Sequence, residues 1–225
     1  MKQFIKGIPV VGKIAVSVKA LLYPQSTFTT SEAYWIQRYK RGENSGAGSY
    51  NRLAEFKGEV INTFVKKHQI RTVIDLGCGD GNQLEYFEFP SYTGFDVSSF
   101  IVSKCRERFK NDESKQFFLL SEISDQRADL LLSLDVIYHL VEDDVYHSYM
   151  NQLFERAISY VIIYSNNEDS ADYAEHIKAR KFTRWIEENK KDFKLIEHIP
   201  NKYPLRKGKV DTTFSDFYIY KRTKT

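Results

Sequence analysis

The sequence predicts an α/β fold in which a mostly parallel, doubly wound sheet carries helices on both faces. Apolar runs of strand length alternate along the chain with segments in which apolar residues recur at helical spacing. A glycine-rich turn follows the buried-looking run 72–76, and the next run, 92–97, brings Asp96 to its end. A strand, a tight glycine turn and a second strand that ends in a carboxylate form the first half of a nucleotide-binding unit.

Length and composition restrict the class of protein. With 225 residues the chain is long enough for one α/β domain with additions. The net charge of +3 is too small to indicate a nucleic-acid partner, so DNA is not expected. Two cysteines make no disulfide framework, which indicates a reduced, cytoplasmic compartment. No apolar run reaches the roughly 18 residues that a membrane-spanning helix needs.

The N-terminal segment allows two interpretations. Residues 1–22 combine lysines with an apolar stripe at helical spacing, and Pro24 ends the segment. The stripe consists of Val11, Ile14, Ala15, Val18, Leu21 and Leu22. Such a helix can pack on its own domain or in a homodimer, or it can lie peripherally on the inner face of a membrane. A cleaved signal peptide is not expected, because lysines interrupt the apolar region.

The next segment, 31–57, predicts a cap over the nucleotide site. Its aromatic residues precede a glycine-rich loop, and a helix is expected to start near Ser49. A glycine-rich loop with aromatic neighbours suits a lid that gates a pocket, although a plain connecting loop also fits. We therefore expect residues 1–48 to form an amphipathic segment with a lid or cap, and residues 49–225 to form the main domain.

The rest of the chain predicts alternating helices and strands. Helices are expected over 98–109, over an acidic-to-apolar segment that begins near Val141, and over 171–189. Strands are expected over 116–120, 128–137, 159–164, 193–199 and 213–220, the last two as a hairpin. This order of elements contains no repeat and no linker, which indicates one domain.

The spacing of the glycines distinguishes between two classes of nucleotide. A dinucleotide site needs G-x-G-x-x-G, with a helix N-terminus facing the pyrophosphate. This chain has G-x-G-x-G at Gly77, Gly79 and Gly81, and Asp75 stands two residues before the first glycine. A carboxylate there is awkward beside a pyrophosphate and well placed for a cation. S-adenosylmethionine carries a sulfonium, an ammonium and a ribose but no phosphate, so the spacing favours it, with Asp96 serving the ribose.

Three ordered motifs carry a resemblance to a known family: V-I-D-L-G-C-G-D-G, F-D-V-S and L-L-S-L-D-V-I-Y-H-L. Across residues 50–220 the chain resembles the class I S-adenosylmethionine-dependent methyltransferases. The resemblance implies a Rossmann-like, seven-stranded sheet with an antiparallel C-terminal strand. It also implies the cofactor S-adenosyl-L-methionine and the product S-adenosyl-L-homocysteine. The segments Y-W-I-Q-R-Y and R-K-F-T-R-W resemble a bacterial subgroup that accompanies surface-polysaccharide genes, which implies a role in polysaccharide biosynthesis.

The same resemblance implies roles for individual residues. The implied cofactor-binding residues are Asp75, Gly77, Gly79, Asp96, Val97, Glu122, Ser133, Leu134 and Asp135. Asp75, Gly77 and Gly79 would hold the methionine end of the cofactor. Asp96 would hold the ribose, with Val97 beside the adenine. The residues from Ser133 to Asp135 would line the other side of the cofactor. The family's usual acid at the adenine amino group is missing or displaced, and Glu122 is the nearest.

The predicted chemistry needs a base and a place for the acceptor. His139 follows the fourth strand and is the candidate general base, although it could instead pack against the next helix. Candidate acceptor-binding residues are Tyr39, Tyr138, His176 and Arg180. The basic patch at 176–181 could hold an anionic acceptor, or it could be a solvated face. No Cys/His set has metal-ligand spacing, so metal-independent transfer is expected.

Taken together, these patterns predict an enzyme that O-methylates a small-molecule or glycan acceptor by in-line transfer. The N/D-P-P-Y/F signature of amino-methylating DNA and RNA enzymes is absent; the corresponding stretch is S-L-D-V-I-Y-H. Two alternatives stay open at this point. One is a methyltransferase that acts on RNA or protein, and the other is a non-catalytic module that binds S-adenosylmethionine.

Overall fold

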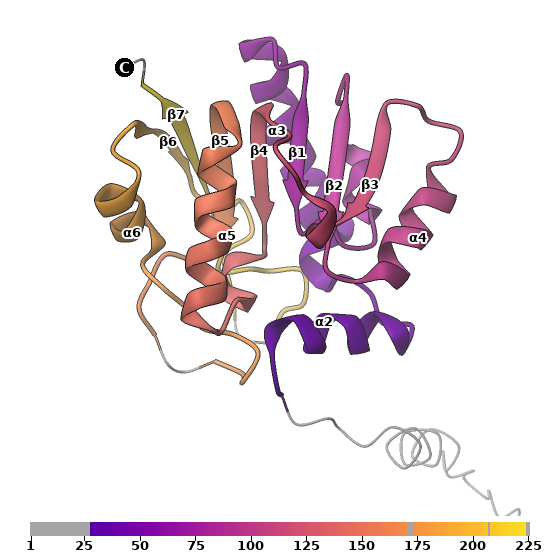
Figure 1. Cartoon of the computed structure of the whole chain (residues 1–225). Helices are drawn as coiled ribbons and strands as arrows, with labels where there is room; N and C mark the ends of the chain where they lie inside the picture. Colours follow the sequence, from indigo (N-terminus) through magenta and orange to yellow (C-terminus); the bar gives the residue numbers. More distant parts are fainter. Residues whose placement is uncertain (1–27, 171–172, 207, 224–225) are drawn as a thin grey trace, which may run out of the picture.

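The computed structural model describes residues 28–170, 173–206 and 208–223, and its centre is one seven-stranded sheet (Figure 1). The strand order is β3-β2-β1-β4-β5-β7-β6. Strands β1 to β5 are parallel, and β7 is antiparallel to both of its neighbours. The strands are β1 (Val73–Leu76), β2 (Tyr92–Asp96), β3 (Lys115–Leu119), β4 (Ala128–Leu134), β5 (Ala157–Ser165), β6 (Phe193–Ile199) and β7 (Asp216–Arg222). The predicted fold class and the late hairpin are confirmed.

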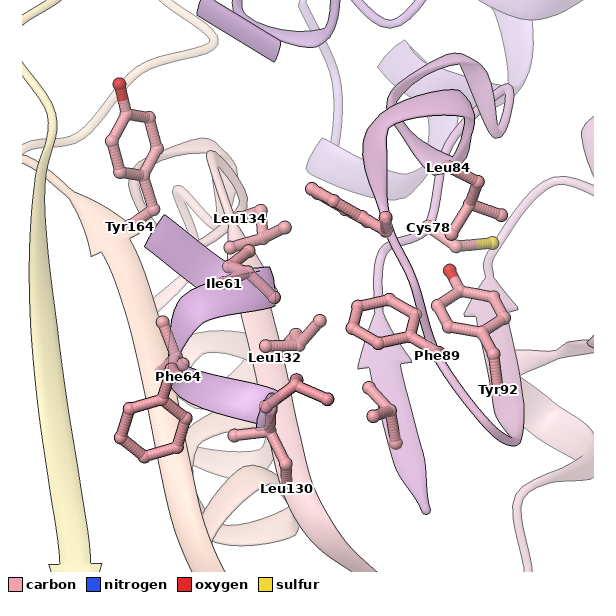
Figure 2. Packing of buried hydrophobic residues seen from close by; sticks show 14 of the residues in the cluster. Ile61, Phe64, Cys78, Leu84, Phe89, Tyr92, Leu130, Leu132, Leu134 and Tyr164 are labelled. Carbon is pink, nitrogen blue, oxygen red and sulfur yellow. The ribbon is translucent and has the colours of Figure 1, made fainter. Parts of the chain in front are cut away.

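Helices cover both faces of this sheet. They are α3 (Asn51–His68), α4 (Ser99–Arg108), α5 (Asp143–Glu155) and α6 (Phe182–Asn189), whereas α2 (Ser31–Lys40) lies across one edge of the sheet. Strand β4 shows how one run serves two faces, because side chains alternate along a strand. Leu130 and Leu132 pack with Ile61 and Phe64 of α3, as Figure 2 shows, and Leu131 packs on the opposite face with α5. The near-continuous apolar runs of the central strands follow from this double burial.

The structure corrects two of the predicted elements. The predicted strand 128–137 ends at Leu134, because Asp135 takes a left-handed backbone conformation with φ of 59° that turns the chain. The predicted helix 171–189 begins only at Phe182. Part of the segment before it lies against the end of the sheet, where the Lys178 amide donates a hydrogen bond to the Tyr138 carbonyl. This tertiary contact replaces the helical hydrogen bond that the local pattern predicted.

Other predicted features fall outside the part of the chain that the structure describes. The amphipathic stripe within 1–22 is one of them, so its packing, its homodimer contact and its membrane contact stay predictions. Within 28–170, 173–206 and 208–223, none of the helices combines the length and apolarity needed to cross a membrane.

Candidate functional site

A cavity of about 640 Å³ opens at the carboxyl ends of β1, β2 and β4. Adjacent parallel strands end at the same edge of a sheet, and a crevice forms where their connections diverge to opposite faces. The wall is built from the glycine loop after β1, the ends of β2 and β4, the short helix η4 (Ile137–His139), the start of α5, and α2. Figure 1 shows α2 crossing this edge of the sheet.

The glycine loop has a backbone that other residues could not follow. Gly77 and Gly79 have φ values of 88° and 60°, in the region that favours glycine. A Cβ on Gly77 would lie 2.6 Å from Cγ2 of Val136, and one on Gly79 would lie 2.3 Å from Oγ of Ser45. Glycine at these two positions therefore lets the loop pack closely against Val136 and Ser45 while it lines the cavity.

Asp96 lies on the cavity wall at the end of β2, as the sequence predicted. Its side chain is almost fully buried and accepts hydrogen bonds from the amides of Gly79 (3.1 Å) and Ser98 (3.0 Å). Burial raises the pKa of this carboxyl to about 6, and the backbone donors oppose that rise. At neutral pH the group is therefore a carboxylate that can accept hydrogen bonds from a ligand.

Asp75, which the resemblance assigns to the methionine end of the cofactor, lies off the cavity wall. It is fully buried beneath the glycine loop and does not line the cavity. The Tyr92 hydroxyl donates to Oδ2 at 2.9 Å, whereas Oδ1 has no hydrogen-bond partner among the described residues. Burial raises the pKa of this carboxyl to about 7. Asp75 thus joins β1 to β2 through Tyr92, and a direct contact with the cofactor stays a prediction.

Asp135 is held in the wall by a buried lysine that the sequence analysis missed. The Lys57 ammonium lies 2.5 Å from Oδ2 of Asp135, and its side chain is fully buried. Oδ1 accepts from the hydroxyls of Tyr138 (3.1 Å) and Ser215 (2.9 Å). One signal was present in the sequence: Lys57 lies on the apolar stripe of α3, four residues after Leu53 and four before Ile61. A lysine in such a stripe needs a buried partner.

His139 lies on the cavity wall in η4, shortly after the end of β4, with a defined orientation. Its Nδ1 lies 3.0 Å from the carbonyl oxygen of His176. A carbonyl can only accept, so Nδ1 carries the proton and Nε2 keeps a free lone pair. Trp35 packs edge-on against the ring, with centroids 4.9 Å apart. Burial lowers the pKa of His139 to about 4, so the ring is neutral at physiological pH.

The segment 31–50, which we call the lid, closes the cavity and is tied at both ends. At one end the amide and hydroxyl of Ser31 donate to the Glu142 carboxylate at 2.9 and 2.6 Å. At the other end Asp80 accepts from the Ser45 amide (2.9 Å) and the Tyr50 hydroxyl (2.8 Å). Between these ties, Trp35 and Tyr39 line the cavity. This placement fits the predicted lid, whose motion stays a prediction.

The remaining predicted residues divide by position. On the wall lie Gly77, Gly79, Asp96, Val97, Leu134, Asp135, Tyr39 and His139. Off the wall lie Asp75, Glu122, Ser133, Tyr138, His176 and Arg180. The Glu122 carboxylate accepts from the Leu119 amide at 2.7 Å, and Ser133 is buried against the Tyr149 hydroxyl. These two side chains hold local structure, so their predicted cofactor contacts have no support from their positions.

The basic patch predicted at 176–181 is largely paired within the chain. Arg180 donates to the carbonyls of Leu140 (2.7 Å) and Val141 (2.9 Å) and to the carboxylate of Asp143 (2.8 Å). Lys178 pairs with the same carboxylate at 2.8 Å. The patch therefore ties the segment before α6 to the start of α5. Within the described ranges, no group of three His, Cys, Asp or Glu side chains is arranged to hold a metal ion.

Comparison with protein families and known sequences identifies part of the chain. A family model described as a methyltransferase domain matches residues 74–157, from β1 to the first residue of β5. A curated relative, named Putative methyltransferase 235L, from Invertebrate iridescent virus 6, is 25% identical over 122 residues. That match covers 51% of this chain and 46% of the relative, so this chain accounts for less than half of the relative's length.

Solved structures resemble the chain over most of its length. The N-methyltransferase NodS from Bradyrhizobium japonicum WM9, in complex with S-adenosyl-L-homocysteine, has a TM-score of 0.65 at 12% identity. Coverage is 87% of this chain and 100% of NodS. Magnesium protoporphyrin IX methyltransferase from Synechocystis PCC 6803, with bound SAM, has a TM-score of 0.58 at 13% identity, covering 88% and 100%. Residues 74–157 thus match the model of a methyltransferase domain, and the chain shares its Rossmann-like fold with these S-adenosylmethionine-dependent methyltransferases.

Proposed function

We propose that this chain is an S-adenosylmethionine-dependent methyltransferase that O-methylates a small-molecule or glycan acceptor. One observation carries the proposal: a single cavity joins a glycine loop and a buried carboxylate to a neutral histidine with a free lone pair. Gly79 and Asp96 stand on the donor side, and His139 stands on the acceptor side.

The residues at the donor end fit S-adenosylmethionine. None of the described lining residues is lysine or arginine, so a pyrophosphate would find no cation in the wall. A sulfonium and an ammonium suit the carboxylates that are present, and the bare backbone of Gly77 and Gly79 leaves space for the methionine end. Asp96 has free acceptor capacity for the two ribose hydroxyls, with Val97 beside it for the adenine.

When bound, S-adenosylmethionine supplies a methyl carbon that the adjacent sulfonium has made electrophilic. The chain aligns the acceptor hydroxyl with that carbon and excludes water, and this positioning can supply much of the acceleration. His139 would accept the acceptor's proton on Nε2 while the acceptor oxygen takes up the methyl group. The donor would leave as a thioether that keeps the carbon–sulfur electron pair. A histidine with a pKa of about 4 is too weak to deprotonate an alcohol beforehand, so proton transfer accompanies methyl transfer.

The acceptor, the location and the partners are proposed from the sequence pattern. The likeness of Y-W-I-Q-R-Y and R-K-F-T-R-W to a polysaccharide-associated subgroup favours a sugar acceptor made in the cytoplasm. Residues 1–22 would bring the enzyme to the inner face of the membrane, or would pair two subunits.

Calorimetric titration with S-adenosylmethionine and with NAD tests the proposal. We expect S-adenosylmethionine to bind and NAD not to bind. Asp96→Asn should weaken donor binding about 10- to 100-fold, because a charged acceptor of hydrogen bonds is lost. Asp112→Asn, on an exposed turn, is the matched control and should bind as the wild type does. NAD binding without S-adenosylmethionine binding would overturn the proposal.

A further inference from the structure

The charged side chains on the cavity wall of the proposed methyltransferase are all acidic. Five carboxylates line it: Glu32, Asp96, Asp135, Glu142 and Asp144. Among the described lining residues there is no lysine and no arginine, and His139 is neutral at physiological pH. Glu32 and Asp144 lie toward the acceptor end with their side chains exposed, on α2 and α5.

The cations nearest to the wall are already engaged within the chain. Lys57 is buried against Asp135, and Arg180 is bound to two carbonyls and to Asp143. Arg38, which lies over the Trp35 ring, donates to the Asn44 carbonyl and pairs with Glu43. A negatively charged ligand would have to break these contacts before any of the three cations could pair with it.

Helix N-termini could also attract an anion, but here they are occupied. Helix α2 starts at the cavity, and the Glu142 carboxylate accepts a hydrogen bond from its first amide, that of Ser31. Helix α5 carries Asp143 and Asp144 in its first turn. Acidic side chains thus neutralise the positive ends of both helices that border the acceptor end.

A second, independent feature says which groups the acceptor must present. The His176 carbonyl holds the proton of His139 on Nδ1, so Nε2 is an acceptor and needs an O–H or N–H from the ligand. Beside it Trp35 gives the acceptor end an apolar ring surface. The site therefore selects a hydrogen-bond donor that also makes apolar contact.

We infer that the acceptor is a hydroxyl or amine compound without an anionic group, so that molecules with phosphate, carboxylate or sulfate are rejected. This inference rests on the proposed function and narrows it. It also reverses the idea that the basic patch at 176–181 grips an anionic acceptor, because Arg180 and Lys178 are used to hold Asp143.

Fluorescence quenching of Trp35 measures the charge of the acceptor end directly. The chain has two tryptophans, and Trp185→Phe leaves only Trp35, which lines the cavity. With S-adenosyl-L-homocysteine bound to fill the donor end, Trp35 should be quenched by acrylamide and by caesium. The quenching constant of each ion is first divided by its constant for free N-acetyltryptophanamide. On this scale, the constant for iodide should be at least threefold smaller than the constant for caesium. Salt should reduce this difference.

Variants connect the measured charge with the named residues. In the Trp185→Phe background, the double substitution Glu32→Gln and Asp144→Asn should bring the ratio of the caesium and iodide quenching constants toward the ratio for free N-acetyltryptophanamide. Glu188→Gln, an exposed acid on α6, should leave it unchanged. Iodide quenching equal to that of caesium would overturn the inference even if S-adenosyl-L-homocysteine binds. Absence of S-adenosyl-L-homocysteine binding would instead overturn the proposed function.

Transfer of labelled methyl groups gives a second readout in matched sets that differ only in charge. Glucose, glucosamine and glucuronate form one set, and tyrosol, tyramine and 4-hydroxyphenylacetate form another. Faster labelling of an anionic member than of its neutral partner would overturn the inference. The inference is supported if the neutral or the cationic compound is labelled at least tenfold faster than the anionic compound of the same set.

Discussion

At the scale of single residues, His139 shows how one backbone carbonyl selects a chemical role. The tautomer follows from the 3.0 Å contact between Nδ1 and the His176 oxygen, and the low pKa follows from burial. A histidine in water would titrate near pH 6.5 and would lose its lone pair in mild acid. In this site the lone pair persists to about pH 4, which suits a base that acts only in concert with bond formation.

This position gives a kinetic prediction. His139→Gln should lower kcat about 100-fold, because proton transfer to a positioned base is lost, while the Kd for S-adenosylmethionine should stay unchanged. His147→Gln, on the exposed side of α5, is the control. His139 should add no limb to the pH profile of kcat between pH 6 and pH 8, since a group with a pKa of about 4 is already deprotonated there. An acidic limb near pH 6.5 that is present in the wild type and lost in His139→Gln would refute the proposed role, whereas a limb shared by both proteins belongs to Asp96 or Asp75, whose pKa values are about 6 and about 7.

At the scale of elements, hydrogen bonds to two carboxylates help to connect the lid to the domain. Glu142 belongs to the turn before α5, and Asp80 belongs to the glycine loop, so the two ties join the lid to both sides of the cavity. Gly48 matters for the same geometry, because a Cβ there would lie 2.5 Å from Oδ2 of Asp135. The lid can therefore lie close over the strand ends only with this residue at position 48.

Weakening one tie should loosen the lid without unfolding the domain. In Ser45→Ala combined with Tyr50→Phe, the hydroxyl contacts with Asp80 are lost. Amides of residues 41–50 should then exchange hydrogen about 10-fold faster, as expected for the loss of roughly 1.5 kcal/mol of charged hydrogen bonding. Mass-spectrometric hydrogen exchange measures this, with Glu55→Gln, an exposed acid on α3, as control. Unchanged exchange in the double variant would show that packing alone holds the lid.

The Lys57–Asp135 pair joins elements that are distant in the sequence. It connects α3 to the end of β4, and Tyr138 and Ser215 complete the coordination of the carboxylate. Burying both charges costs solvation free energy, which the ion pair and the added hydrogen bonds offset. The pair also shapes the site, because it fixes the direction of a carboxylate whose backbone is in the left-handed region.

At the scale of the whole molecule, buried carboxylates make stability depend on pH. The folded-state pKa of Asp75 is about 7 and exceeds its unfolded value near 3.9, so the folded state binds a proton more tightly. The protonated Asp75 carboxyl therefore adds to the free energy of unfolding below about pH 4, and this contribution is lost as the pH rises through 7. His139 acts in the opposite direction between about pH 6.5 and pH 4, because its folded-state pKa is lowered.

Comparing Asp75→Asn with the wild type isolates the contribution of Asp75, because the other groups cancel in the difference. We expect the Tm of the variant, relative to the wild type, to rise by several degrees between pH 5 and pH 8. The neutral amide can still accept from the Tyr92 hydroxyl, and it does not carry the cost of a buried charge. Thermal unfolding at the two pH values tests this. A constant difference would mean that Asp75 stays charged in the folded protein with little penalty.

Much of this molecule could be predicted because the decisive patterns are local. The apolar runs and the glycine turn predict the strands, and the ends of parallel strands bring Gly79, Asp96 and His139 to one cavity. The side of β1 on which Asp75 lies could not be predicted, since all four residues of that strand are buried. The partner of Lys57 lies 78 positions away, and contacts at that separation leave no periodic trace. The helix predicted over 171–189 begins only at Phe182, because contacts with the end of the sheet outweigh local propensity before that residue.

The place of β7 has a consequence for how the chain is made. It is the last of the seven strands to leave the ribosome, yet it lies inside the sheet, between β5 and β6. Until it emerges, β5 offers an open edge whose sequence, A-I-S-Y-V-I-I-Y-S, is strongly apolar. A nascent chain that stalls before residue 216 would therefore leave the edge of β5 unpaired and open to strands of other chains. Rapid synthesis of β6 and β7 after β5 would limit this aggregation.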